Sequence, residues 1–198
     1  GISYIDSTPI RVCRNKRIKR NKVFKGIAEV GKSTMGYFYG FKLHLLIDCE
    51  TKFPIALIVT NGLASDGTLA IPLLKKARAW LKRCGYVLAD KGYDDGDIVN
   101  WIVKALQAKA GIPIRKTYKG KKGDKGGNFL NWQLKAKGRS IKKSIYNRRT
   151  SVERGFSVLR RSYHLGKEET RGILNFAKNV YLALISYMLK LFDIAIST

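Results

Sequence analysis

The sequence predicts an α/β fold, a mixed five-stranded sheet flanked by helices. The first observation is a stretch from Tyr37 to Ile47 in which every odd position is apolar or aromatic. This period of two indicates a strand with one well-buried face. The second is the order of segments, a hairpin meander followed by alternating helical and β-type runs. That order is typical of a mixed sheet with helices on both faces. With 198 residues, 45% of them hydrophobic, we expect a single domain over 1–198 with a real core.

The first half of the chain supplies the meander. A first strand is expected at 3–12, with Pro9 giving it an irregular end. Residues 14–34 are rich in Lys and Arg and are expected to form a loop. The next strand covers 37–47, and its hairpin partner covers 53–60.

The second half alternates between helices and strands. Asp66 is expected to cap the first helix, and Gly85 to end it. The elements expected are, in order, a helix at 68–83, a strand at 86–89, a helix at 97–109, a strand at 112–114, a glycine-rich basic insertion at about 116–143, a helix containing 146–161 and a last helix at 173–196.

Topology brings two acidic residues together. A right-handed crossover would place the strand that ends at Asp90 parallel to the first strand, which carries Asp6, and beside it. Neighbouring strands lie about 4.8 Å apart. The two carboxylates are therefore expected to be close enough to share one cation.

The charge of the chain predicts a polyanionic partner. There are 39 Lys and Arg against 14 Asp and Glu, a net charge of +25, and the pI is about 10.2. Nucleic acid is the usual partner of such a field. The charges cluster in 11–42 and 115–149, where DNA contact is favoured over a merely solvated face. A structural protein of the ribosomal type has the same balance, so charge predicts a partner and no reaction.

The cysteines and the apolar segments predict a cytoplasmic protein. Cys13, Cys49 and Cys84 lie far apart, which suggests neither a zinc site nor a disulfide framework and fits a reducing compartment. The apolar run 180–188 is short and has charged residues around it, so we expect a buried C-terminal helix and no membrane span. A strand begins within a few residues of Gly1, so we expect a preceding N-terminal region to be absent from this chain.

Three of the acids stand apart from the others. Asp6 and Asp90 lie in or just after β-type runs, where Asp is disfavoured, although each can alternatively form a turn. Glu153 is the only acid in the arginine-rich segment YNRRTSVERGFSVLRR. On a helix, Tyr146, Arg149 and Arg160 fall within about 40° of Glu153 around the helix axis, so the four residues share one face. The alternative is a surface ion pair between Arg149 and Glu153. Three carboxylates from separate elements suit Mg²⁺.

These segments resemble a known family. The runs YIDSTPI, LADKGYDD and YNRRTSVERGFSVLRR are similar to those of insertion-sequence DDE transposases, which have a ribonuclease H-like catalytic core. In that group one helix carries the motif Tyr-x2-Arg-x3-Glu-x6-Lys, in which x is any residue. Here Arg160 stands in the position of the Lys. The resemblance implies that Asp6, Asp90 and Glu153 are the catalytic, metal-binding triad and that Tyr93 completes the Asp90 motif.

The resemblance also implies an activity and partners. Two Mg²⁺ ions, with Mn²⁺ as a substitute, would support phosphodiester hydrolysis at transposon ends and 3′-OH strand transfer into target DNA. A homodimer would hold two ends in the synaptic complex, in bacterial cytoplasm at the nucleoid, and a DNA-end recognition region usually lies N-terminal to the core. The predicted DNA contacts are Tyr93, Tyr146, Arg148, Arg149, Arg160, Lys16, Arg17, Lys19, Arg20, Lys142 and Lys143.

Two other functions remain open. One is a domesticated or inactive relative that binds DNA without cutting it. The other is a ribonuclease H-fold nuclease that hydrolyses DNA without joining it. Assays with divalent metal separate the three functions. The inactive relative gives DNA binding alone, the nuclease gives nicking alone, and the transposase gives nicking followed by strand transfer.

Overall fold

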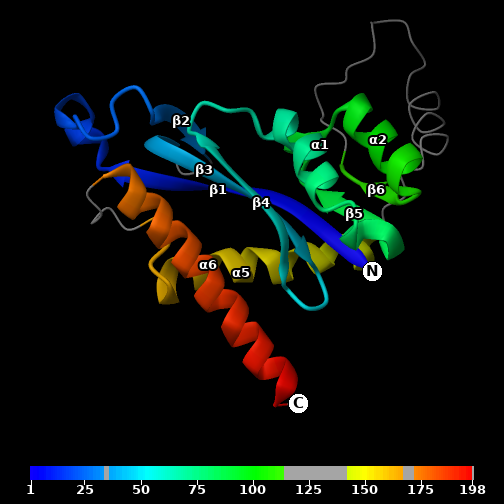
Figure 1. Cartoon of the computed structure of the whole chain (residues 1–198). Coiled ribbons are helices and arrows are strands. Elements are labelled where there is room, and N and C mark those ends of the chain that lie inside the picture. The colour runs from blue at the N-terminus through cyan, green and yellow to red at the C-terminus, as the bar shows by residue number, and fades with distance from the viewer. Residues whose placement is uncertain (34–35, 114–141, 167–171, 198) are drawn as a thin grey trace, which may run out of the picture.

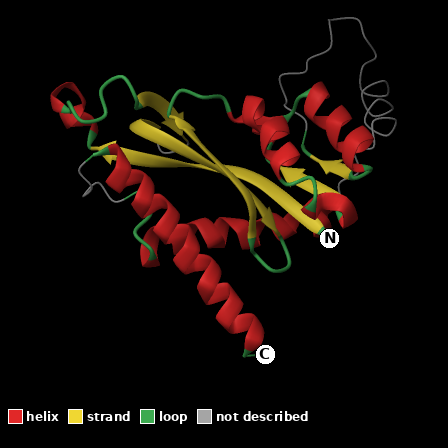
Figure 2. Cartoon of the chain, viewed as in Figure 1, coloured by secondary structure: helices red, strands yellow, loops and turns green. Residues whose placement is uncertain are grey.

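The computed structural model describes residues 1–33, 36–113, 142–166 and 172–197. These residues form a mixed sheet flanked by helices, which confirms the α/β, ribonuclease H-like prediction (Figures 1 and 2). The sheet has six strands, not the five predicted. The strands are β1 (Ile2–Cys13), β2 (Glu29–Ser33), β3 (Gly36–Asp48), β4 (Pro54–Asn61), β5 (Tyr86–Ala89) and β6 (Lys109–Gly111).

Strand β1 lies at the centre of the sheet. It pairs antiparallel with β3 and parallel with β5, and β5 pairs parallel with β6. The other edge of β3 is shared by two strands, because β2 pairs with its first part and β4 with the remainder. The parallel neighbours β1 and β5 are those predicted from the right-handed crossover.

The extra strand β2 comes from the segment expected to be a loop. Residues 14–34 instead hold the 3₁₀ turn η1 (Asn15–Arg20) and β2. The sequence of β2, Glu-Val-Gly-Lys-Ser, has no apolar alternation. It is a strand because the start of β3 offers it backbone partners. Gly31 is required there, since a Cβ would collide with the backbone oxygen of Gly62.

The helices differ from the prediction mainly at their ends. The helix expected at 68–83 ends early and resumes as a 3₁₀ turn, and the one expected at 97–109 ends at Leu106 because Gln107 adopts a left-handed conformation. The last strand therefore lies at 109–111, before Pro113. The bounds are α1 (Asp66–Lys76), η2 (Trp80–Arg83), η3 (Lys91–Tyr93), α2 (Gly96–Leu106), α4 (Lys143–Tyr146), η4 (Asn147–Arg149), α5 (Thr150–Ser162) and α6 (Ile173–Ile196).

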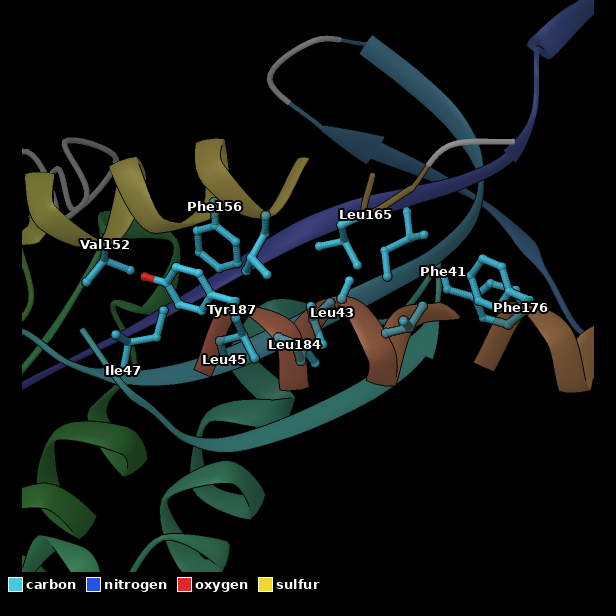
Figure 3. Close-up of a cluster of buried hydrophobic side chains, with 14 of the residues drawn as sticks. Phe41, Leu43, Leu45, Ile47, Val152, Phe156, Leu165, Phe176, Leu184 and Tyr187 are labelled. Carbon is cyan, nitrogen blue, oxygen red and sulfur yellow. The ribbon is translucent and has the colours of Figure 1, made fainter. Parts of the chain in front are cut away.

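Each face of the sheet has its own core. Alternate side chains of β1, among them Tyr4 and Ile10, pack with α5 and α6, and Figure 3 shows part of this core. The intervening residues, such as Ile5, pack with α1 and α2 on the opposite face. The alternation along β1 therefore decides which helix layer each of its polar residues faces.

One described helix meets the length and composition of a membrane span. Helix α6 has 24 residues, and its most apolar window is only 22% buried. Figure 1 shows its C-terminal part extending away from the sheet. The predicted bounds of this helix, 173–196, agree with the structure.

Candidate active site

The strand register brings Asp6 and Asp90 to the same level. Ile5 of β1 pairs with Ala89 of β5 in a parallel ladder, and each acid is the next residue along its strand. Adjacent strands are about 4.8 Å apart. By alternation both acids face the α5–α6 layer, because their i−2 neighbours, Tyr4 and Leu88, belong to that core.

Both carboxylates are oriented by local backbone hydrogen bonds. The Ser7 N–H donates to Asp6 Oδ1 at 2.8 Å, and the Gly92 N–H donates to Asp90 Oδ1, where β5 leads into η3. A Cβ on Gly92 would lie 2.6 Å from that same Asp90 oxygen. The turn that the sequence offered as an alternative explanation therefore exists at Asp90, whereas Asp6 lies inside the continuous strand β1 and forms no turn.

Glu153 approaches from the helix layer. It lies on α5, whose buried residues Val152, Phe156 and Leu159 pack on the sheet (Figure 3). Its side chain is 51% exposed, and Oε1 lies 3.9 Å from Arg149 Nε. This is the ion pair considered as the alternative role for Glu153. Such an i,i+4 pair is worth only about 0.2–0.5 kcal/mol, so a change of rotamer at Glu153 costs little.

The residues predicted to share the helix face of Glu153 contact one another and, at one point, β1. The Arg149 guanidinium lies 4.7 Å from the centre of the Tyr146 ring and donates to Tyr146 Oη at 3.2 Å. Farther along α5, Arg160 donates to Thr8 Oγ1 on β1. Two cationic groups thus flank Glu153, and Arg160 is anchored two residues from Asp6.

The carboxylates act on one another electrostatically. Burial raises the pKa of Asp6 from 3.8 to about 7; the Ser7 hydrogen bond opposes the rise, and the charges of Asp90, Asp66 and Glu153 add to it. A buried carboxylate with negative neighbours is stabilised by a nearby cation. The charges of the other two predicted acids, Asp90 and Glu153, therefore both act on Asp6.

This donor set fits a divalent cation in chemistry, although its three members are not drawn together. Within the described parts of the chain, no three His, Cys, Asp or Glu side chains lie close enough to hold one ion. Two level carboxylates, with a third on a half-exposed side chain opposite, match the oxygen ligands that Mg²⁺ prefers. Asp6, Asp90 and Glu153 therefore stay a prediction as its ligands.

The predicted DNA contacts between residues 142 and 160 fall into three groups. Tyr146, Arg149 and Arg160 lie at the site, as described above. Arg148 pairs instead with Glu50 at the β3–β4 turn, 3.3 Å away. Lys142 and Lys143 are exposed at the start of α4, which follows the insertion. Most of the insertion predicted at 116–143 lies outside the described residues.

The basic turn η1 lies far from the acids. Cys13, the last residue of β1, lies seven positions after Asp6, which is a rise of about 23 Å. Figure 1 shows η1 at the end of the sheet opposite α1 and α2. Its exposed cations are Lys16, Arg17, Lys19 and Arg20.

Tyr93 does not fit its predicted role. Its side chain is 2% exposed and packs in the core with α1 and α2. The prediction of a DNA contact for this side chain is therefore wrong. The cause is the short turn η3, which folds Tyr93 back under the Asp90 loop and toward the opposite face of the sheet.

A polar cluster behind the acids was not predicted as part of the site. Lys42 Nζ donates to Ala64 O at 2.8 Å and to Asp66 Oδ1 at 3.3 Å, and His44 Nδ1 lies 3.8 Å from the same oxygen. Asp66 is not the helix cap that the sequence suggested, since Ser65 occupies that position. The available signal was the pair of polar residues, Lys42 and His44, on alternate positions of an otherwise apolar strand.

Comparison with known proteins gives the family. The sequence matches the family described as "Transposase DDE domain" over residues 1–189. No curated protein matches it. The match covers nearly the whole chain, including both strands that carry the aspartates and the helix that carries the glutamate. The chain therefore belongs to the DDE transposases.

Proposed function

We propose that this transposase domain hydrolyses phosphodiester bonds at transposon ends and joins the resulting 3′-OH to target DNA. The supporting observation is the level placement of Asp6 and Asp90 on adjacent parallel strands, with the charge of Glu153 reaching Asp6. These three carboxylates are the metal ligands in the proposal. Bound Mg²⁺, which Mn²⁺ can replace, supplies the charge that polarises the phosphoryl oxygens and activates the attacking group.

The neighbouring cations position the DNA. Arg149, held by the Tyr146 ring and hydroxyl, and Arg160, anchored on Thr8, stand on either side of Glu153 along the helix. Guanidinium groups bind phosphate oxygens in pairs and keep their charge. In the proposal they hold the two phosphates next to the scissile bond and leave the acids free for the metal.

No protein nucleophile is required. Tyr93 is buried, and burial raises the pKa of Tyr146 even though Arg149 opposes the rise. A tyrosine with a raised pKa is a poor nucleophile at neutral pH. The attacking group is then water in the first step and a DNA 3′-OH in the second.

The rest of the DNA path follows the exposed cations. η1 and the start of α4 carry the predicted contacts outside the site. The distance of η1 from the acids suits a duplex that runs across the molecule, and counterion release would contribute most of the affinity. A chain with this charge is expected at the bacterial nucleoid.

Two other activities are separated from this one by a single experiment. The chain is incubated with supercoiled plasmid and labelled candidate ends, with and without Mg²⁺. Nicking of the ends followed by transfer of label into the plasmid supports the proposal. Nicking without transfer identifies a nuclease, and a retarded complex with no new DNA ends identifies an inactive DNA-binding relative; either result contradicts the proposal.

A further inference from the structure

A cleft beside the acids has no part in the proposed function as described so far. It lies between the β2–β3 hairpin and the start of α1, and its volume is about 410 Å³. The residues that line it include Lys32, Tyr37, Lys42, Asp66 and Gly92. Ligand sites usually have volumes of about 300–1,000 Å³. The cleft is therefore large enough for a nucleotide of a single strand and too small for a duplex.

The cleft lies next to the acids. Gly92 lines the cleft and also donates the N–H that holds the Asp90 carboxylate. Asp66, at the start of α1, is near enough for its charge to contribute to the raised pKa of Asp6. Helices α1 and α5 pack on opposite faces of the sheet (Figure 1). The cleft therefore approaches the acids from the α1 side, whereas the arginines of α5 approach them from the other side.

Two side chains at the mouth of the cleft have the chemistry that binds a DNA strand. Lys32 and Tyr37 lie opposite each other in the β2–β3 ladder, and Lys32 Nζ is 5.8 Å from the centre of the Tyr37 ring. Both side chains are exposed, Tyr37 by 61%. Proteins bind single strands with cations that neutralise the phosphates and aromatic rings on which the bases stack. Lys32 and Tyr37 supply one of each.

Lys42 adds a second cation inside the cleft. Its side chain is 12% exposed. An ammonium group has three N–H donors, and Lys42 directs two of them to Ala64 O and Asp66 Oδ1. The third can bond a phosphate oxygen. Because the charged residues in the lining are Lys32, Lys42 and Asp66, the cleft keeps a net positive charge.

Strand transfer requires two DNA molecules at one set of acids. The 3′-oxygen of the cleaved end forms a bond to a phosphorus atom of the target. The P–O3′ bond of the target breaks, and the proton of the attacking hydroxyl passes through solvent to the 3′-oxygen that leaves. In the proposed function, Arg149 and Arg160 already hold the phosphates of the transposon end. The target strand therefore needs a second binding surface beside the acids.

We propose that the cleft binds the target strand during strand transfer. Tyr37 stacks on a base of that strand, and Lys32 and Lys42 neutralise its phosphates. The proposal rests on the proposed function and deepens it, because it assigns the two DNA substrates to opposite sides of the acids, the transposon end to α5 and the target to the cleft. Stacking and phosphate contacts do not depend on the identity of the base, so this site adds little preference for a target sequence.

The test measures the two steps of the reaction separately. End cleavage is followed on labelled uncut ends in Mg²⁺. Strand transfer is followed with a labelled precut end that has a free 3′-OH and with increasing concentrations of supercoiled plasmid as the target. Tyr37→Ala should raise the plasmid concentration for half-maximal transfer about 10-fold, because a stacking ring is lost. Lys32→Gln should raise it too and should reduce the slope of its logarithm against log salt by about 0.9.

Matched variants make the result specific. Tyr37→Phe keeps the aromatic ring and should transfer ends like the parent chain. Tyr181→Ala removes a ring that is 50% exposed on α6, and Lys104→Gln removes an exposed charge on α2. Both residues lie outside the cleft lining, so both substitutions should leave cleavage and transfer unchanged. Because Tyr37 and Lys32 are exposed, their substitution should not unfold the chain, and circular dichroism checks this.

Each outcome decides the proposal. Loss of transfer by Tyr37→Ala with normal end cleavage supports it. Transfer by Tyr37→Ala and Lys32→Gln at the plasmid concentrations of the parent chain would overturn it and leave the proposed function intact. An equal loss of cleavage and transfer would assign the cleft to the transposon end instead of the target. A parent chain that does not cleave or does not transfer ends would contradict the proposed function, and the role of the cleft with it.

Discussion

The protonation of Asp6 links the site to the stability of the fold. Burial and the charges of its acidic neighbours raise its pKa to about 7. The folded chain therefore holds a proton at pH values where the unfolded chain has released it. The stability from this group is complete below about pH 4 and is lost as the pH rises through about 7.

Asp6→Asn should remove this loss. Without divalent metal the variant should be more stable than the parent chain at about pH 8, by an amount on the order of a few kcal/mol, and equally stable at about pH 4. Urea unfolding in EDTA at the two pH values measures the difference. Glu29→Gln, on the exposed side of β2, is the control. If the Asp6→Asn variant were less stable than the parent chain at about pH 8, Asp6 would be ionised in the folded chain and its charge would be stabilised there.

Lys42 connects β3 to the segment before α1. Its ammonium group bonds Ala64 O and Asp66 Oδ1 and is largely buried. Lys42→Met should therefore lower the free energy of unfolding by about 1–3 kcal/mol, because two acceptors lose a charged donor. Lys104→Met, on the exposed face of α2, should change it by less than about 0.5 kcal/mol. Equal effects of the two substitutions would show that the cluster is not structural.

At the scale of elements, the contact between α5 and α6 positions Glu153. Gly155 is buried two residues after Glu153, and a Cβ there would lie 2.9 Å from Tyr187 Oη on α6. Gly155→Ala raises the helix propensity, by up to about 1 kcal/mol. It also places a methyl group too close to Tyr187 Oη. We expect the substitution to destabilise the parent chain and to stabilise a Tyr187→Phe background, where the hydroxyl is absent. A thermal-unfolding double-mutant cycle measures this coupling, and additive effects would contradict the close approach.

The elements predicted most accurately are those whose sequence pattern reflects burial. Strand β3 has strong periodicity, and its position agrees with the structure. The bounds of α6 also agree, but the prediction that it is a buried helix is wrong, because its most apolar window is only 22% buried. β2 was missed because its pairing depends on β3 and not on its own side chains. The placement of Asp6 beside Asp90 followed from a topological rule, whereas the position of Asp66 depends on the path of the segment after β4, for which sequence has no rule.

For the whole molecule, charge predicts how the chain binds DNA. Replacing Lys16, Arg17, Lys19 and Arg20 with Gln should weaken binding and reduce the slope of log affinity against log salt by about 0.9 for each phosphate that is no longer neutralised. Cleavage at saturating DNA should persist, because η1 follows the end of β1 that lies about 23 Å along the strand from Asp6. Replacing Lys75, Lys76, Arg78 and Lys82 on the α1–η2 surface removes the same charge and is the control. Fluorescence anisotropy over a range of salt concentrations measures both, and identical slopes would exclude η1 from the DNA path.

The central claim is that Asp6, Asp90 and Glu153 act as one site. It is tested most directly by cleavage of labelled transposon-end DNA in Mg²⁺ by Asp6→Asn, Asp90→Asn and Glu153→Gln, with Glu50→Gln as the control at an exposed acid of the β3–β4 turn. We predict that each of the three abolishes cleavage, by at least about 1000-fold, while DNA binding is retained and the control cleaves normally. Cleavage by Glu153→Gln at the rate of the control would contradict the account.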